Sequence, residues 1–133
     1  MENAWEYLES IGIVSEKCFP YTAGSGIEAP CASSCVDGAP FNKFKCEFGS
    51  IVHPTTVDEI KTELFNNGPL EGAFTVYEDF FNYQSGVYHH VSGGVAGGHA
   101  IKVLGYGTEN GVDYWLCANS WGTEWGMQGF FKI

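Results

Sequence analysis

Basic residues are scarce in this sequence of 133 residues, where six lysines and arginines stand against sixteen aspartates and glutamates. The formal net charge is -10 at pH 7. Nucleic acids and anionic membranes both attract positively charged protein surfaces. The charge therefore argues against nucleic acid or a membrane as a partner.

Long apolar runs are absent as well. No stretch approaches the roughly 20 apolar residues of a membrane-spanning helix, and the opening MENAWEYLES is not a signal peptide. A helical pattern begins almost at the first residue, and a strand pattern is still apolar at Ile133. We therefore expect a piece of a longer protein.

Aromatic residues and glycines are abundant. The aromatic content of 16% and the 18 glycines predict a packed domain with many tight turns, typical of a β-rich protein. Of the five cysteines, Cys18, Cys31 and Cys35 cluster in the Gly-, Pro- and Ser-rich part of the irregular region predicted over 15–50. This clustering favours disulfides and an oxidising compartment.

The periodicity predicts helices first and strands afterwards. ENAWEYLESIG gives one apolar helical face that Gly12 can end, and TTVDEIKTELFNNGP predicts a helix over 57–66 with a capping box of Thr56 and Glu59. Strands are predicted over 70–77, 85–91, 98–107, 112–121 and 128–133. We expect an α+β fold.

His99 is the first candidate for chemistry. It begins an apolar strand, where a histidine is more often structural, but Gly97 and Gly98 precede it. Two residues without side chains leave space beside the ring for a substrate backbone. An imidazole beside such a space suits a general base.

Asn119 follows at the end of another apolar strand, where an amide needs a partner. Its oxygen can accept the ring N–H of His99 and fix the tautomer, while Trp121 and Trp125 exclude water. The alternative is a buried amide bonded to backbone, with the tryptophans in the core. These residues alone favour neither interpretation.

A strict two-residue turn at Asn110-Gly111 would place His99 and Asn119 on opposite faces of the sheet, because side chains alternate. Their meeting requires an irregularity, for which Gly105 and Gly107 are plausible sites.

Two further side chains, Cys117 and Ser120, could be nucleophiles. Cys117 lies between Leu116 and Ala118 in a strand, with no local cation or helix to lower its pKa. Ser120 lacks a sharp glycine-flanked turn. We expect neither to attack a substrate.

Three long stretches carry a family resemblance. GGHAIKVLGYGTENGVDYWLCANSWGTEWGMQGFF resembles the papain-like cysteine peptidases around their catalytic histidine and asparagine. NNGPLEGAFTVYEDFFNYQSGVYHHVSG and ENAWEYLESIGIVSEKCFPY resemble the cathepsin B group of that family. The resemblance implies a papain-like fold, of which this chain holds mainly the right-hand antiparallel β-barrel-like lobe (51–133) and a left-lobe helix (1–14).

The resemblance also implies roles for individual residues. His99 would be the general base and acid, oriented by Asn119 under the cover of Trp121. Trp125 would line the leaving-group side of the cleft. The residues bordering the bound substrate backbone would be Gly97, Gly98 and Ala100. No metal or cofactor is implied.

The family's nucleophile segment, Gln-x-x-x-x-x-Cys-Gly-Ser-Cys-Trp, has no counterpart here. The resemblance therefore places the catalytic cysteine upstream of Met1 and predicts that this chain alone is inactive. The stretch YTAGSGIEAP replaces the histidine-bearing occluding loop of cathepsin B, which predicts endopeptidase activity on peptides or proteins. His89 and His90 lie elsewhere and are interpreted as structural.

The resemblance further implies that Cys18 bonds Cys35 and that Cys31 pairs with an upstream cysteine. A zinc site at Cys31 and Cys35 is an alternative that lacks two ligands at suitable spacing. Cys46 and Cys117 have no expected partner. A lysosome-like compartment or secretion is expected from the family and from cysteine usage.

Two other functions share some of these sequence features. A non-catalytic papain-like module with a replaced nucleophile keeps the same visible residues, and only the upstream sequence separates it from an enzyme. A nucleotide-binding site at GYGTENG is set aside, because its glycine spacing is wrong and it leads into a strand.

Overall fold

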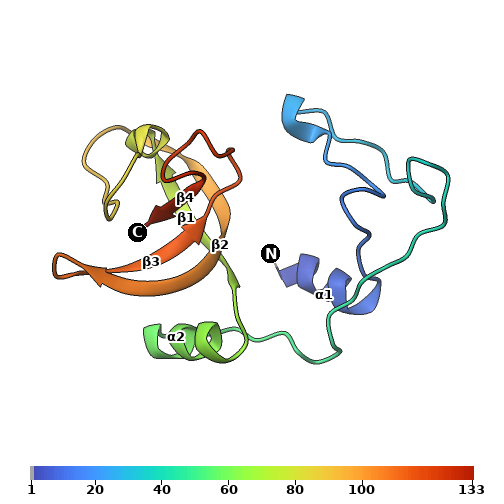
Figure 1. The fold of residues 1–133 in the computed structure, drawn as a ribbon, viewed down its shortest axis with the longest axis horizontal. Helices are drawn as coiled ribbons and strands as arrows, with labels where there is room; N and C mark the ends of the chain where they lie inside the picture. The colour runs from blue at the N-terminus through green and yellow to red at the C-terminus, as the bar shows by residue number, and fades with distance from the viewer. Residues whose placement is uncertain (1) are drawn as a thin grey trace. The chain divides into compact units, whose positions relative to one another are not determined.

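The computed structural model describes residues 2–133, and the chain divides into two units, Met1–His53 and Pro54–Ile133. Met1, the first residue of the predicted helical segment 1–14, lies outside the described residues. The elements in chain order, shown in Figure 1, are α1 (Glu2–Ser10), η1 (Ala23–Ser25), α2 (Val57–Asn66), β1 (Leu70–Tyr77), η2 (Glu78–Asn82), β2 (Val95–Glu109), β3 (Val112–Ala118) and β4 (Phe130–Lys132).

In the first unit, Gly12 ends α1 as predicted. Its φ of 81° lies in the left-handed region, and its N–H donates to the Tyr7 carbonyl at 2.9 Å. A Cβ at this position would lie 2.6 Å from the Phe44 carbonyl oxygen, so the close pairing of Ile13 with Phe44 also requires glycine.

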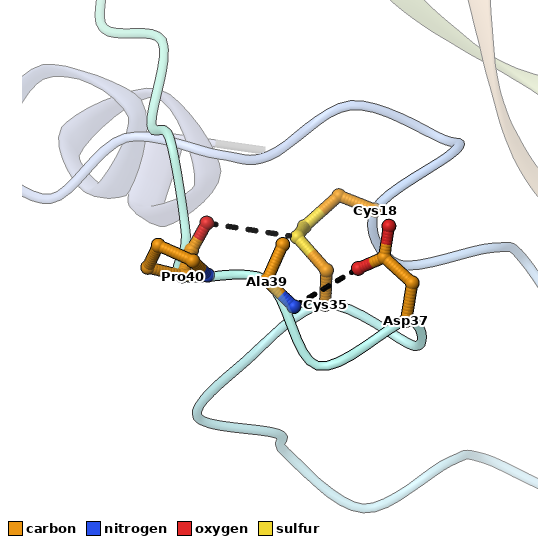
Figure 2. The surroundings of a disulfide bond; sticks show 5 residues. All are labelled: Cys18, Cys35, Asp37, Ala39 and Pro40. Atoms are coloured by element: carbon orange, nitrogen blue, oxygen red, sulfur yellow. Dashed lines mark hydrogen bonds between the residues drawn. A yellow bond between two sulfur atoms is a disulfide. The ribbon is translucent and has the colours of Figure 1, made fainter.

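Cys18 and Cys35 form a disulfide within the irregular region of this unit (Figure 2). The turn after Cys35 is closed by Asp37, whose carboxylate accepts the Ala39 N–H at 3.0 Å. Because Cys35 is bonded to Cys18, it cannot be the zinc ligand of the alternative interpretation. Cys31 is exposed and unbonded.

In the second unit, α2 has the predicted bounds and capping box. Thr56 Oγ1 accepts the Glu59 N–H, and the Glu59 carboxylate accepts the Thr56 N–H at 3.0 Å. The helix contacts β2 of an antiparallel four-stranded sheet with the order β1-β2-β3-β4. Figure 1 shows that β2 and β3 form a long, curved hairpin within this sheet.

The prediction of a strand over 85–91 is wrong. Only Val87 in that range pairs, through an isolated bridge to Lys132. The backbone N–H groups of Val91 and Ser92 donate to the side chain of Asp79 instead of to a neighbouring strand. A side-chain acceptor has therefore replaced the strand pairing that the alternating pattern predicts.

The core of the second unit is largely aromatic. Phe80 and Phe131 are completely buried, and their ring centroids lie 5.0 Å apart at 78°. Edge-to-face pairs of this kind stabilise the fold beyond the contribution of the apolar area that each ring buries. The buried cluster consists of Val76, Phe80, Tyr83, Cys117 and Phe131.

Candidate active site

The β2–β3 hairpin contains the predicted irregularity. A two-residue turn at Asn110-Gly111 starts a regular register that continues to Gly105↔Leu116. The next pair is Val103↔Cys117, so Leu104 is an extra residue in β2. The bulge adjoins Gly105, one of the two expected sites, and brings His99 and Asn119 onto the same face.

His99 Nε2 lies 2.8 Å from Asn119 Oδ1. The same oxygen accepts the Ser120 backbone N–H at 2.8 Å, which fixes the orientation of the amide. Since Oδ1 can only accept, Nε2 carries the ring proton. In the neutral ring Nδ1 is then the basic nitrogen.

The other atom of the amide, Asn119 Nδ2, is buried and has no hydrogen-bond partner within residues 2–133. An unpaired buried donor costs about 1–3 kcal/mol. A purely structural amide would be expected to satisfy both its ends with backbone groups. Within residues 2–133, the amide therefore makes its hydrogen bonds through Oδ1 alone, to His99 and to the Ser120 N–H.

Trp121 covers this hydrogen-bonded pair. Its ring stacks on the His99 imidazole at a centroid distance of 5.0 Å and 26°. The Phe81 ring stacks on the Trp121 ring at a centroid distance of 5.3 Å and an interplanar angle of 20°. Trp125 packs edge-on against Trp121 and donates its Nε1–H to the Phe81 carbonyl at 3.0 Å.

Phe81 was missed by the sequence analysis. Its side chain is 51% exposed beside the Trp121 ring. The sequence signal was weak, because Phe80 and Phe81 are adjacent and nothing in their order shows that Phe80 is buried and Phe81 is not.

The backbone before His99 is open. A Cβ placed on Gly97 or Gly98 would meet no atom within 4 Å, apart from chain neighbours. Ala100 is exposed on the other side of His99. Gly97 also has a φ of 151°, which side-chain-bearing residues rarely adopt. Within residues 2–133, the space beside the backbone of Gly97 and Gly98 is therefore unoccupied.

The two alternative nucleophiles are one buried thiol and one exposed hydroxyl. Cys117 is 1% exposed, and burial raises the pKa of its thiol to about 12. Ser120 is exposed, but its contribution to the pair is its backbone N–H. The burial of Cys117 agrees with the expectation that it does not react, and the expectation for Ser120 stays a prediction.

The two other histidines of this unit differ in environment. His89 is exposed. His90 stacks on the Tyr77 ring at 3.8 Å and 16°, and its Nδ1 lies 3.2 Å from both carboxylate oxygens of Asp79. Asp79 is the second residue that the sequence analysis missed.

Among residues 2–133, no three histidine, cysteine, aspartate or glutamate side chains are grouped to hold a metal ion. In the same part of the chain, no helix has the length and apolar character needed to cross a membrane.

Comparison with known proteins gives one consistent result. The model of the family described as "Papain family cysteine protease" matches residues 1–133. "Cathepsin B-like cysteine proteinase 3" of Caenorhabditis elegans is 45% identical over 134 residues, covering 87% of this chain and 35% of that protein. "Cathepsin B-like CP3" of Giardia intestinalis is 41% identical over 135 residues, covering 100% of this chain and 45% of that protein.

A solved structure, "proCathepsin B S9 from Trypanosoma congolense", has a TM-score of 0.84 and 39% identity, covering 99% of this chain and 46% of that one. The chain thus spans less than half the length of each relative. The relatives are similar to this chain in sequence, and the solved structure is similar in fold. The chain belongs to the papain family of cysteine proteases and has the α+β, papain-like fold.

Proposed function

We propose that this chain supplies the histidine and asparagine of a Cys-His-Asn site in a cathepsin-B-like cysteine endopeptidase. The observation that carries the proposal is the 2.8 Å contact between His99 Nε2 and Asn119 Oδ1 under the Trp121 ring. This contact leaves Nδ1 of the ring available to a nucleophile and orients it.

The nucleophilic cysteine lies in an upstream segment of the same domain. In this arrangement 51–133 forms the right-hand lobe and 1–14 contributes a left-lobe helix. Exposed apolar side chains support the proposal that a further part of the domain covers them. Phe48 is 90% exposed and Ile27 74% in the first unit, and Phe65 is 84% exposed in the second.

The reaction is acyl transfer through a thioester. His99 Nδ1 takes the thiol proton, and the thiolate sulfur attacks the peptide carbonyl carbon, whose π electrons move to oxygen. Collapse of this adduct breaks the C–N bond, and the leaving amine takes the proton from His99. A water molecule, deprotonated by His99, then hydrolyses the thioester and restores the thiol.

Peptide or protein substrates lie along the open backbone of Gly97 and Gly98 beside Ala100, and Trp125 borders the leaving group. The lack of a histidine in YTAGSGIEAP favours cleavage within chains over removal of C-terminal dipeptides. The Cys18–Cys35 bond supports an oxidising setting, in a lysosome-like compartment or outside the cell.

Labelling of the full-length protein with a thiol-directed epoxide tests the proposal. One cysteine upstream of this chain should be labelled, and labelling should slow strongly in His99→Ala. The 133-residue chain alone should cleave no peptide. A full-length protein that neither reacts nor cleaves a blocked peptide would instead be a non-catalytic papain-like module.

A further inference from the structure

One carboxylate, that of Asp79 in η2, accepts four donors from the segment between Tyr88 and Ser92, while the Tyr88 N–H donates to the Lys132 carbonyl at 2.8 Å. Its Oδ1 accepts the Tyr88 hydroxyl at 2.6 Å. Its Oδ2 accepts the backbone N–H groups of Val91 at 2.7 Å and Ser92 at 3.1 Å. His90 Nδ1 lies 3.2 Å from both oxygens.

The partners of Asp79 are themselves held in place. The Tyr88 ring packs edge-on against the buried Phe80 at 4.8 Å, and His90 stacks on Tyr77. The Asp79 side chain is only 13% exposed. Burial acts to raise its pKa, but the hydrogen bonds from Tyr88, from the two backbone N–H groups and from His90 outweigh it, so the pKa lies well below its usual range.

The segment held by Asp79 leads directly into the catalytic strand. The neighbouring Glu78 continues the contact, because its N–H donates to the Gly94 carbonyl at 3.0 Å and its carboxylate accepts the Gly94 N–H at 3.1 Å. The β1–β2 register then shifts by one residue between Val95 and Gly97. Gly97, Gly98 and His99 follow at once, with His99 opposite Phe74.

His99 is therefore approached from two sides. Asn119, which directly follows β3, fixes its ring, and the segment 88–94 fixes the start of the strand that carries its backbone. We propose that Asp79 is a positioning residue for His99, acting by holding the segment 88–94 against η2 so that the start of β2 keeps its place. This inference rests on the proposed function.

The chemistry of the site explains why a charged carboxylate is needed. Two oxygens with several lone pairs can accept four donors at once, whereas an asparagine offers one acceptor oxygen and an NH2 group. In Asp79→Asn that NH2 would face either the Tyr88 hydroxyl or the backbone N–H groups of Val91 and Ser92. In the first case the Tyr88 hydroxyl accepts instead of donating, and in the second the two N–H groups lose their acceptor. In both cases the remaining bonds are no longer made to a charged carboxylate and are weaker, so the segment loosens.

The test compares Asp79→Asn with Asp113→Asn in the full-length protein. Asp113 is an exposed carboxylate in the same unit, bonded to Thr108 Oγ1, so its substitution makes the same charge change away from the site. Active sites are counted with the thiol-directed epoxide before kcat is calculated. A residue that serves only stability would lower the number of competent sites and leave kcat per site unchanged.

We expect kcat per counted site to fall roughly ten- to a hundredfold in Asp79→Asn, with a smaller change in KM, because a slight misplacement of a catalytic group has effects of that size. Asp113→Asn should match the wild type. Tyr88→Phe removes one donor and keeps the packed ring, so it should lower kcat less and in the same direction. If Asp79→Asn does not fold, kcat per counted site of Tyr88→Phe tests the inference in its place.

Hydrogen exchange of the full-length protein gives a readout that needs no catalysis. In Asp79→Asn the amides of residues 95–99 should exchange at least about tenfold faster than in the wild type. In Tyr88→Phe the increase should be smaller. In Asp113→Asn these amides should exchange at the wild-type rate. Unchanged kcat per site together with unchanged exchange would overturn the inference. A wild-type protein without reactive cysteine or activity would overturn the proposed function, and the exchange result would still decide the role of Asp79 in holding this strand.

Discussion

His99 and Asn119 meet at 2.8 Å because β2 has one residue more than β3 between the pairs Gly105↔Leu116 and Val103↔Cys117. Without the extra residue, alternation would put the two side chains on opposite faces of the hairpin. The candidate site therefore depends on a local irregularity of the sheet. The Ser120 N–H then completes the arrangement by fixing the amide that holds the imidazole.

Replacing Asn119 by alanine should lower kcat/KM of the full-length protein by roughly a hundredfold, because the imidazole then loses the contact that fixes its tautomer and direction. Ser120→Ala is the matched control. It keeps the backbone N–H that bonds Asn119 and removes only an exposed hydroxyl, so activity should stay at the wild-type value. Steady-state kinetics on a blocked peptide measure both variants, and equal activities would contradict the orienting role.

The need for an irregularity in the hairpin could be predicted from the sequence because it depends on short-range rules, whereas the contact between His99 and Asn119 itself was expected only from the family resemblance. The turn at Asn110-Gly111 sets the register, alternation sets the faces, and a glycine marks where the register can shift. The bounds of α2 and its capping box follow from equally local signals.

Asp79 could not be found in the same way. Its four donors lie 9 to 13 residues further along the chain, and two of them are backbone groups that carry no sequence signal. The alternation in SGVYHHV predicts a strand, but the donors of that segment bond to a side chain. Long-range pairing with a single acceptor overrides the local pattern.

Cys117 should resist alkylation in the folded 133-residue chain. With a pKa raised to about 12 by burial, its thiolate fraction at pH 8 is on the order of 10⁻⁴, and the thiol is also inaccessible. The exposed Cys31 should react readily under the same conditions. Mass spectrometry after brief iodoacetamide treatment separates the two, and rapid modification of Cys117 would contradict its assignment to the core.

The same burial gives a pH dependence with a definite sign. The unfolded chain ionises Cys117 near its ordinary pKa of 9.0, whereas the folded chain holds it as a thiol up to about 12. Its contribution to stability is therefore present below pH 9 and is lost as the pH rises from 9 towards 12. Thermal melts of Cys117→Ala should lack this part of the alkaline decline.

Asp79 should protect the second unit in mild acid. Its pKa is held well below the usual value, so its contribution to stability is present above the unfolded pKa of about 3.9 and is lost only as the pH falls through the lower folded pKa. The melting temperature of Asp79→Asn should lie below that of the wild type at pH 5 to 7. The gap should narrow below pH 4, and a gap that widened in acid would contradict the sign.

Gly97 and Gly98 should respond differently to alanine, although both precede His99. A Cβ at either position meets open space, but Gly97 has a φ of 151° and Gly98 has no such constraint. Gly97→Ala should therefore lower the melting temperature of the 133-residue chain, while Gly98→Ala should leave it nearly unchanged or raise it slightly.

In the full-length protein Gly98→Val should fold normally and still raise KM about tenfold or more, because its side chain occupies the space through which a substrate backbone approaches. Melting curves and KM values measured together distinguish a glycine required by its own backbone from one required by the substrate, and an unchanged KM in Gly98→Val would show that peptides do not bind along this strand.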